Sequence, residues 1–556
     1  MKNKYQFLLF VPVLIVYIIG MFIDVMEIDA AQYAAMSREM LDAHNYLEIY
    51  DRGVDYLDKP PLLFWLSTLS FKLFGISNFS YKLPSVLFSI LALFSTYHLG
   101  KALRNERTGF YSALILSSCQ AYFLINHDVR TDTILAACTI FSIWQLYLFT
   151  LNNRFLNLFF GALGIGGAML TKGPIGIMVP ALALGFHLLV RREWKTIFKW
   201  QWLLIIPLVL IFLSPMLVGL YLQYDLQPGK LIHGVPIQSG LQFFFWTQSF
   251  GRITGESIWK DDTTPLFFTH TFLWAFLPWC LLFVVGFWSD TKKLILSKFK
   301  LSDREEAITW GGFVFPFVAF SLSHYKLPHY IFVVFPLAAI LAGKYAERLF
   351  RERNNSLRIN ILRGSQFFIS LLLYGLAFLL CFFSFPLQSL FLWSIFVVGL
   401  GLSIYFVWKG QHHFQRIVIP CFIAIVVLNF LLNMHFYPAL SHYAAANQAA
   451  QMVRASPEES KSFVTFHEKR YGLDFYSRQC IPDYDKLSDL MEEKKKETIW
   501  IFTNTPGYEE IKATKIKITE EKKLEDFRIS RLSIKFLNPS TRVSQIKVKY
   551  LLKVEL

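Results

Sequence analysis

Charged residues are scarce in this chain. Of its 556 residues, 17% are charged and 54% are hydrophobic, whereas a water-soluble globular protein carries roughly 25% charged residues. The scarcity of charge excludes an ordinary cytosolic enzyme, and the abundance of apolar residues excludes a disordered or collagen-like chain. The 56 Phe and 14 Trp suit a lipid-facing surface.

Acidic residues are fewer than basic ones. The chain has 40 Asp and Glu against 55 Lys and Arg, which gives a net charge of +15. Such a surplus can mark a nucleic-acid-binding protein, but in a membrane protein it is typical of basic cytoplasmic loops. We therefore expect membrane lipids, and no nucleic acid, among the partners of the chain.

Cysteine is rare and several catalytic motifs are missing. Five of the six cysteines lie in apolar runs, with no CxxC and no zinc-ligand spacing, so no disulfide framework is expected. The sixth, Cys480, is interpreted as a core thiol rather than a nucleophile. The absence of HExxH argues against a membrane zinc protease, and the absence of GxxxxGK[ST] between a strand and a helix argues against an ATP-driven transporter.

Long apolar runs dominate the first four-fifths of the chain. A membrane helix needs about 20 apolar residues, and the sequence predicts about 13 spans. They are expected at 5–23, 82–100, 108–125, 132–150, 155–170, 174–190, 203–222, 267–289, 307–323, 327–346, 367–385, 388–408 and 416–435. The first run is flanked by Lys2 and Lys4 and followed by Asp24 with no small-residue cleavage site, which indicates a retained anchor rather than a signal peptide.

Basic residues are distributed unevenly over the loops between these spans. With the N-terminus inside, the inside loops near 101–107, 191–199, 292–304 and 344–363 carry many Lys and Arg. The short outside loops carry only Arg130, Lys172 and Lys326. Because cytoplasmic loops are enriched in Lys and Arg, we expect a cytoplasmic N-terminus.

Two outer segments are long, residues 24–81 and 223–265. The first contains a candidate amphipathic helix, Ala30–Ala43, expected along the membrane surface. The second is a candidate cover for a cavity and a determinant of acceptor choice. Its notable residues are Trp246, Arg252, Glu256 and Trp259.

The composition changes after residue 435. Residues 436–556 are rich in Lys, Glu and alternating apolar residues, so we divide the chain into a membrane domain, 1–435, and a small outer C-terminal α/β domain, 436–556. Alternation and short apolar runs predict strands at 462–466, 498–503, 511–518 and 527–536 and helices at 441–454 and 486–495. The expected fold class is a polytopic α-helical membrane protein with this α/β domain attached.

Ionisable residues gather at the outer ends of the expected spans. Such groups are costly near a membrane and by default suggest function. The outer set is Asp29, Tyr33, Asp58, Lys59, Asp128, Arg130, Asp132, Lys172, Lys326, His329 and Tyr330. A shared outer cavity would bring carboxylates and cations together, and the alternative is a set of solvated loop charges.

These residue types suit transfer from a lipid phosphate. A departing phosphate needs cations, and the set offers Lys59, Arg130, Lys172 and Lys326. An incoming hydroxyl needs a carboxylate base, which Asp29 or Asp132 could supply. Asp29 begins the expected surface helix, where it suits either an anion site or an N-cap.

Several motifs, taken together, resemble a known family. They are Asp29-Ala30-Ala31-Gln32-Tyr33 with Ser37-Arg38-Glu39-Met40-Leu41, Tyr56-Leu57-Asp58-Lys59-Pro60-Pro61, Arg130-Thr131-Asp132, Leu170-Thr171-Lys172-Gly173-Pro174 and Ser321-Leu322-Ser323-His324-Tyr325-Lys326-Leu327-Pro328-His329-Tyr330. In this order and placement the chain resembles the bacterial GT-C membrane glycosyltransferases related to protein O-mannosyltransferases and to the lipid A aminoarabinose transferase.

The resemblance implies an undecaprenyl- or other polyprenyl-phosphate sugar donor, inversion at the anomeric carbon and an acceptor at the outer face of the bacterial inner membrane. It also implies roles for five residues. Asp29 matches the essential first-loop aspartate, Asp132 the second acidic position, and Lys59 a lysine that holds the donor phosphate, with Tyr56 and Tyr330 lining that site.

The motifs also depart from the family. Ala30 stands where Glu is frequent, Gln32 where the aminoarabinose transferase commonly has Arg, and Asp58 where Glu often precedes Lys-Pro-Pro. Asp58 with a histidine such as His329 could imitate a divalent metal site of that transferase, but we predict no required metal or other cofactor.

The leading hypothesis is an inverting glycosyltransferase with a C-terminal domain on the periplasmic side. Its acceptor is lipid A or lipopolysaccharide, another envelope glycan, or a protein. The second hypothesis is a flippase for lipid-linked sugars that performs no chemistry, against which stands the absence of an internal repeat. The third is an assembly protein that docks partners through residues 436–556.

Overall fold

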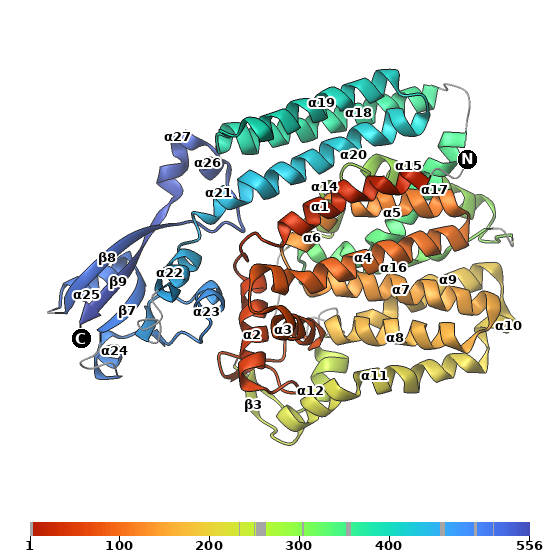
Figure 1. The fold of residues 1–556 in the computed structure, drawn as a ribbon. Coiled ribbons are helices and arrows are strands. Elements are labelled where there is room, and N and C mark those ends of the chain that lie inside the picture. Colours follow the sequence, from red (N-terminus) through yellow and green to blue (C-terminus); the bar gives the residue numbers. More distant parts are fainter. Residues whose placement is uncertain are drawn as a thin grey trace.

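The computed structural model describes residues 4–232, 234–248, 251, 263–302, 305–351, 357–455, 462–493, 498–514 and 516–555. Apolar helices run side by side through most of the elongated molecule, and a sheet-containing domain lies at one end (Figure 1). The N- and C-termini mark opposite ends of this arrangement. Of the residues expected to cover a cavity, Arg252, Glu256 and Trp259 lie outside the described part.

Eight helical segments of the described chain are long and apolar enough to cross a membrane. They are Asn78–Leu103 (α4), Thr131–Asn152 (α7), Phe155–Lys172 (α8), Trp194–Asp225 (including α11, Ile205–Leu220), Pro328–Arg351 (including α17, Phe335–Arg351), Leu357–Ser384 (including α18, Leu357–Phe378), Leu390–Lys409 (α19) and His413–Ser441 (including α20, His413–Leu431). A bent pair, α5 (Glu106–Ser117) and α6 (Gln120–His127), makes a ninth if counted as one span. The polytopic helical fold is confirmed, whereas the expected number of spans stays a prediction.

The remaining expected spans are shorter or broken helices. Among them, Gln6–Gly20, Ile175–Val190 and Ile308–Leu322 are apolar but have fewer than 18 residues. The run at 267–289 is divided into α14 (Phe267–Ala275) and α15 (Cys280–Leu296) around Pro278. A further short apolar helix, α3 (Leu62–Phe74), was not expected.

Other elements complete the described chain. Their bounds are α1 (Phe10–Gly20), α9 (Ile175–Arg191), α10 (Trp194–Ile197), β3 (Lys230–Ile232), β4 (Val235–Ile237), α12 (Gly240–Gln242), α16 (Ile308–Leu322), α21 (Tyr437–Ser441), α22 (Ala445–Arg454), α24 (Leu487–Glu493) and α27 (Pro539–Arg542).

The first outer segment folds around α2 (Asp29–Ala43), within one residue of the expected helix. This helix packs against α3 on one side and against α23 (Tyr471–Ser477) of the C-terminal domain on another. Most of its residues are buried, including the polar Ser37 and Arg38. The helix is therefore held between two parts of the protein and does not present one apolar face to lipid.

A five-stranded sheet forms the centre of the C-terminal domain. Its order is β6 (Asp483–Tyr484), β5 (Phe463–Phe466), β7 (Thr498–Asn504), β9 (Lys547–Glu555) and β8 (Lys517–Asp526). β5 runs parallel to β6 and β7, whereas β9 runs antiparallel to β7 and β8. Ile499 and Ile501 of β7 share a core with α24 and α25 (Thr505–Lys512), while Trp500 and Phe502 face the core that holds α22 and α23. Alternate residues of β7 are thus buried on opposite faces of the sheet.

Two of the four expected strands are wrong. Residues 511–518 contain the end of α25, whose start is fixed by Asn504 accepting from the Gly507 amide and by the following proline. Residues 527–536 form turns and the start of α26 (Ile534–Leu537). The strand actually present, β8, is mostly exposed and rich in Lys and Glu, so it lacks the apolar alternation of a half-buried strand, as is usual at a sheet edge.

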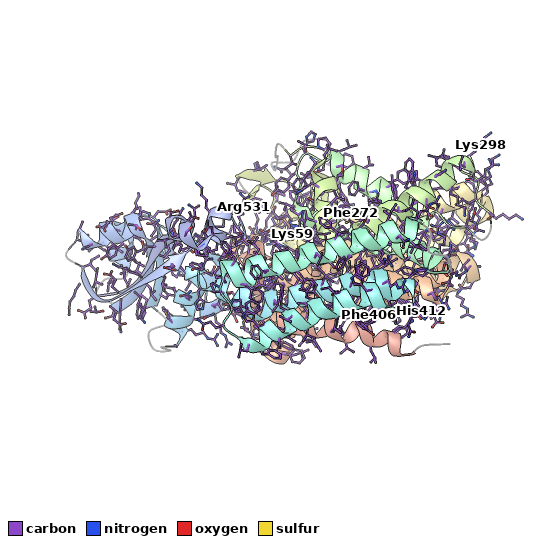
Figure 2. The ribbon with its side chains drawn as sticks, turned by 90° about the horizontal axis from the view of Figure 1, so that it is seen from above. Lys59, Phe272, Lys298, Phe406, His412 and Arg531 are labelled. Carbon is purple, nitrogen blue, oxygen red and sulfur yellow. The ribbon has the colours of Figure 1, made fainter. Side chains whose placement is uncertain are left out.

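The two ends of the membrane domain differ. Lys59 lies toward the C-terminal domain, whereas Lys298 of an inside loop lies at the far end (Figure 2). Lys59 and the basic loop that contains Lys298 are therefore at opposite ends of the bundle. One cysteine expectation is wrong: Cys480 is exposed, in the loop that follows α23.

Candidate functional site

Helix termini place the charged side chains of the outer motifs. Asp29 is the first residue of α2, and Asp132 lies in the first turn of α7. The partial positive charge at a helix N-terminus favours both carboxylates. Lys172 is the last residue of α8, which Gly173 ends with a φ of 72°, a conformation that costs glycine little. Three separate helix termini thus place charged groups at one end of the bundle.

Asp29, Arg130 and Asp128 form the first charge cluster. The guanidinium of Arg130 donates to a carboxylate oxygen of Asp29 and lies 2.8 Å from one of Asp128. Burial lowers the pKa of Arg130, whereas the negative charges of Asp128 and Asp29 raise it. The carboxylates have the larger effect, so the pKa of Arg130 lies above the ordinary value. The Asp29 side chain is 39% exposed. Arg130 therefore orients a carboxylate that remains accessible.

Asp132, Lys172, His329 and Tyr330 form the second cluster. Lys172 Nζ donates to Asp132 Oδ1 at 2.5 Å, and His329 Nε2 lies 3.7 Å from Asp132 Oδ2. The same ammonium lies 3.7 Å from the centre of the Tyr330 ring, a cation–π contact. The Asp132 side chain is only 2% exposed. This carboxylate is thus a buried partner of Lys172.

Tyr33 lies between the two clusters. Burial raises its pKa well above the ordinary value, with the charge of Asp29 acting in the same direction and that of Arg130 against it. Tyr330 and Asp132 of the second cluster also act on this hydroxyl. The Tyr33 and Tyr56 rings both contact Phe64 edge-on, with centroids 5.8 and 6.1 Å away. An aromatic unit therefore connects the clusters to the Lys59 loop.

Lys59 lines a narrow cavity that is partly open to solvent. The walls are mainly apolar and come from the first outer segment, α11 and the second outer segment: Leu47, Ile49, Tyr56, Leu57, Pro60, Pro61, Met216, Leu220, Gln223, Phe244 and Gln248. The side-chain amide of Gln248 donates to the carbonyl oxygen of Asp58. The described part of the second outer segment therefore closes one side of this cavity.

Lys326 contacts the end of the second outer segment. Its Nζ donates to the carbonyl oxygen of Thr263 at 3.0 Å, and the residue is 6% exposed. The neighbouring Tyr325 ring lies 6.4 Å from that of Tyr330. Lys326 thus ties its loop to the end of the second outer segment.

Metal-ligating residues do not converge in the described chain. No group of three or more His, Cys, Asp or Glu side chains there could hold a metal ion. His329, the candidate partner of Asp58, approaches the Asp132 carboxylate instead. Among the described residues, His329 is therefore part of the second charge cluster.

Sequence reasoning missed three residues that join the first outer segment to the C-terminal domain. The Gln32 amide donates to Asp51 Oδ2 at 2.8 Å and to the Tyr471 hydroxyl at 3.2 Å, and that hydroxyl donates to Asp51 at 2.9 Å. Gln32 was noted only as a departure from the family. No sequence signal relates it to a residue more than 400 positions away.

The arrangement of the helices defines the class of the protein as a GT-C membrane fold. ArnT of Cupriavidus metallidurans in the apo state superposes with a TM-score of 0.72 at 17% identity, over 99% of this chain and 98% of that one. The same protein bound to undecaprenyl phosphate gives a TM-score of 0.70 at 19% identity, over 94% and 97% of the two chains.

Sequence comparison agrees with this fold. The family model described as dolichyl-phosphate-mannose-protein mannosyltransferase matches residues 58–218. An undecaprenyl phosphate-alpha-4-amino-4-deoxy-L-arabinose arabinosyl transferase of Proteus mirabilis is 26% identical over 60% of this chain and 57% of its own length. The corresponding transferase of Edwardsiella ictaluri gives the same identity and coverage. The alignment spans little more than half the length of these relatives. The chain therefore has a GT-C fold and is similar in sequence to transferases of the kind that its motifs indicated.

Proposed function

We propose that this protein is an inverting glycosyltransferase. It moves a sugar from a polyprenyl phosphate to a cell-envelope acceptor at the outer face of a bacterial inner membrane. The observation that carries the proposal is the accessible Asp29 carboxylate, oriented by Arg130 and connected to the Lys59 loop by the Tyr33–Phe64–Tyr56 aromatic unit.

We assign the donor phosphate to the Lys59 cavity. An ammonium is a point charge suited to phosphate, and the apolar walls suit the first isoprenoid units of the lipid. The solved relative holds undecaprenyl phosphate, and the matched relatives are named as transferases that use this carrier. These names support transfer rather than the flippase hypothesis.

The reaction needs few groups. The acceptor oxygen attacks the anomeric carbon on the face opposite the phosphate, so the new glycosidic bond forms as the carbon–oxygen bond to phosphate breaks. The bonding electrons leave with the polyprenyl phosphate, whose added negative charge Lys59 stabilises. A hydroxyl acceptor gives its proton to Asp29. A phosphate acceptor is already ionised, and Asp29 then acts by positioning it.

Loop charges give the orientation. The basic loop that contains Lys298 lies at the end of the bundle opposite Lys59, and loops rich in Lys and Arg are typically cytoplasmic. We therefore place the N-terminus in the cytoplasm, and the site and the C-terminal domain, residues 436–556, in the periplasm. Lys172 and Lys326 hold the loops around the donor in place. Lys172 contacts the Tyr330 ring, and Lys326 donates to the Thr263 carbonyl oxygen.

A transfer assay in detergent tests the proposal. Purified protein is given synthetic polyprenyl-phosphate sugars and a membrane extract, and the labelled product is isolated for its acceptor and anomeric configuration. We expect an inverted product from wild type, none from Asp29→Asn, and normal transfer from Asp42→Asn. Asp42 is the matched control because it lies on the same helix and pairs with Arg38 away from the site. Retention of configuration, or equal transfer by Asp29→Asn, would overturn the mechanism.

A further inference from the structure

The start of α2 is held from the C-terminal domain on both sides of Asp29. Two residues before it, Glu27 Oε1 accepts from the Gly472 amide at 2.5 Å. Three residues after it, the Gln32 amide approaches the Tyr471 hydroxyl and the Asp51 carboxylate. Consecutive residues of α23 therefore bracket the proposed base.

The hairpin after α2 is held by the same short helix. Arg52 lies at the turn between β1 (Tyr50–Asp51) and β2 (Val54–Asp55), and its guanidinium pairs with the buried Asp474 at 2.5 Å. It also lies 4.8 Å from the centre of the Tyr471 ring. Glu39 of α2 accepts from the backbone amides of Arg52 and Gly53 at 2.8 and 2.7 Å. Helix, hairpin and α23 form one hydrogen-bonded unit.

Close backbone approach makes this contact specific. A Cβ at Gly472 would lie 3.0 Å from Glu27 Oε1 and would also meet the side chain of Asn447. Asn447 in turn donates to the Val25 carbonyl at 3.2 Å. A larger residue at 472 would displace the segment that leads into Asp29.

We propose that α23 is a clamp that fixes Asp29 in its reactive position, with Tyr471 as a positioning residue. The proposal rests on the glycosyltransferase function above and gives the C-terminal domain a part in the reaction. Tyr471 is connected to Asp29 through Gln32, Asp51 and the helix backbone. It therefore influences the position of the Asp29 carboxylate and takes no part in the chemical step. Misplacing a reacting group by about 1 Å can cost about 100-fold in rate.

The decisive variant is Tyr471→Phe, which removes one hydroxyl and keeps the ring. We expect kcat to fall about 10- to 100-fold, with the donor KM changed less than about twofold because the Lys59 cavity does not contain Tyr471. The matched control is Tyr508→Phe, whose hydroxyl donates to Glu521 at 2.9 Å within the C-terminal domain. Equal kcat in Tyr471→Phe and wild type, or a change confined to KM, would overturn the clamp.

Gln32→Ala breaks the same contact from the membrane domain. If both residues act through one unit, the double variant should be no slower than the worse single variant. Losses that multiply would show independent effects and would overturn the proposal. Because Gln32→Ala leaves the C-terminal domain unaltered, it also decides the matter if Tyr471→Phe fails to fold.

Hydrogen exchange tests whether α23 holds α2 in place, independently of any transfer activity. Peptides from α2 should exchange faster in Tyr471→Phe than in wild type or Tyr508→Phe, while α17 peptides should not change. Unchanged exchange in α2 would overturn the clamp whatever the activity. A wild-type protein that transfers nothing would overturn the proposed function and the catalytic part of this inference, and the exchange of α2 would still decide whether α23 holds the helix.

Discussion

Asp29 and Asp132 invite comparison because each lies in the first turn of a helix and each pairs with a cation. Asp29 is 39% exposed and meets a guanidinium that it shares with Asp128. Asp132 is 2% exposed and meets Lys172 and His329. The same residue type at the same helical position thus becomes an accessible group in one place and a buried ion-pair partner in the other. Accessibility, which depends on the neighbouring elements, separates the two.

The largest expected effect is on catalysis at Asp29. Asp29→Asn should lower kcat about 100- to 10,000-fold with a hydroxyl acceptor, the usual contribution of a general base. Its melting temperature should stay close to that of wild type, because the side chain is accessible. Steady-state kinetics and thermal unfolding in detergent measure the two quantities. If Asp29→Asn kept its activity but lost stability, Asp29 would be a structural ion-pair partner and not the base.

Breaking the buried ion pair between Lys172 and Asp132 should lower the stability of the protein. Lys172→Met leaves the Asp132 carboxylate buried without its ammonium, and we expect a loss of about 3–5 kcal/mol. The double variant Lys172→Met/Asp132→Asn should recover much of the lost melting temperature, because the uncompensated charge is gone. No recovery in the double variant would mean that Lys172 acts mainly on something other than Asp132.

Lys59 should affect donor binding. Lys59→Ala removes a charge-assisted contact worth about 1.5–3 kcal/mol, so the donor KM should rise about 10- to 100-fold. Lys298→Ala, at the opposite end of the bundle (Figure 2), is the control and should behave as wild type. If Lys59→Ala leaves the donor KM unchanged, the donor does not bind in the Lys59 cavity.

Glu27 offers a third carboxylate with a smaller, pH-dependent effect. Burial raises its pKa from 4.5 to about 7, with the Gly472 amide acting in the opposite direction. The folded state therefore favours the protonated acid, so this stabilisation is complete below about pH 4.5 and is lost as pH rises through about 7. The difference is at most about 3 kcal/mol. Melting curves between pH 5 and 8 should fall less steeply for Glu27→Gln than for wild type, and parallel curves would contradict this.

The apolar runs predicted the helical membrane domain because about 20 apolar residues in succession have few other stable environments. The N-terminal start of α2 followed from Asp29, and the strands around 462–466 and 498–503 followed from alternation or short apolar runs. β8 was missed because an edge strand made of Lys and Glu carries no such alternation. The short α3 was missed because its 13 residues are fewer than a full span requires.

The class of fold, the set of outer charged residues and the order of the motifs could be predicted from the sequence, because they depend on local composition and on the high cost of charge in a membrane. Which charges meet depends on how the helices and the C-terminal domain pack. The pairing of Asp29 with Arg130, the burial of Asp132 against Lys172 and the contact of Tyr471 with Gln32 join residues that are 40 to 439 positions apart. Such contacts arise from helix packing and domain docking, which no local pattern records.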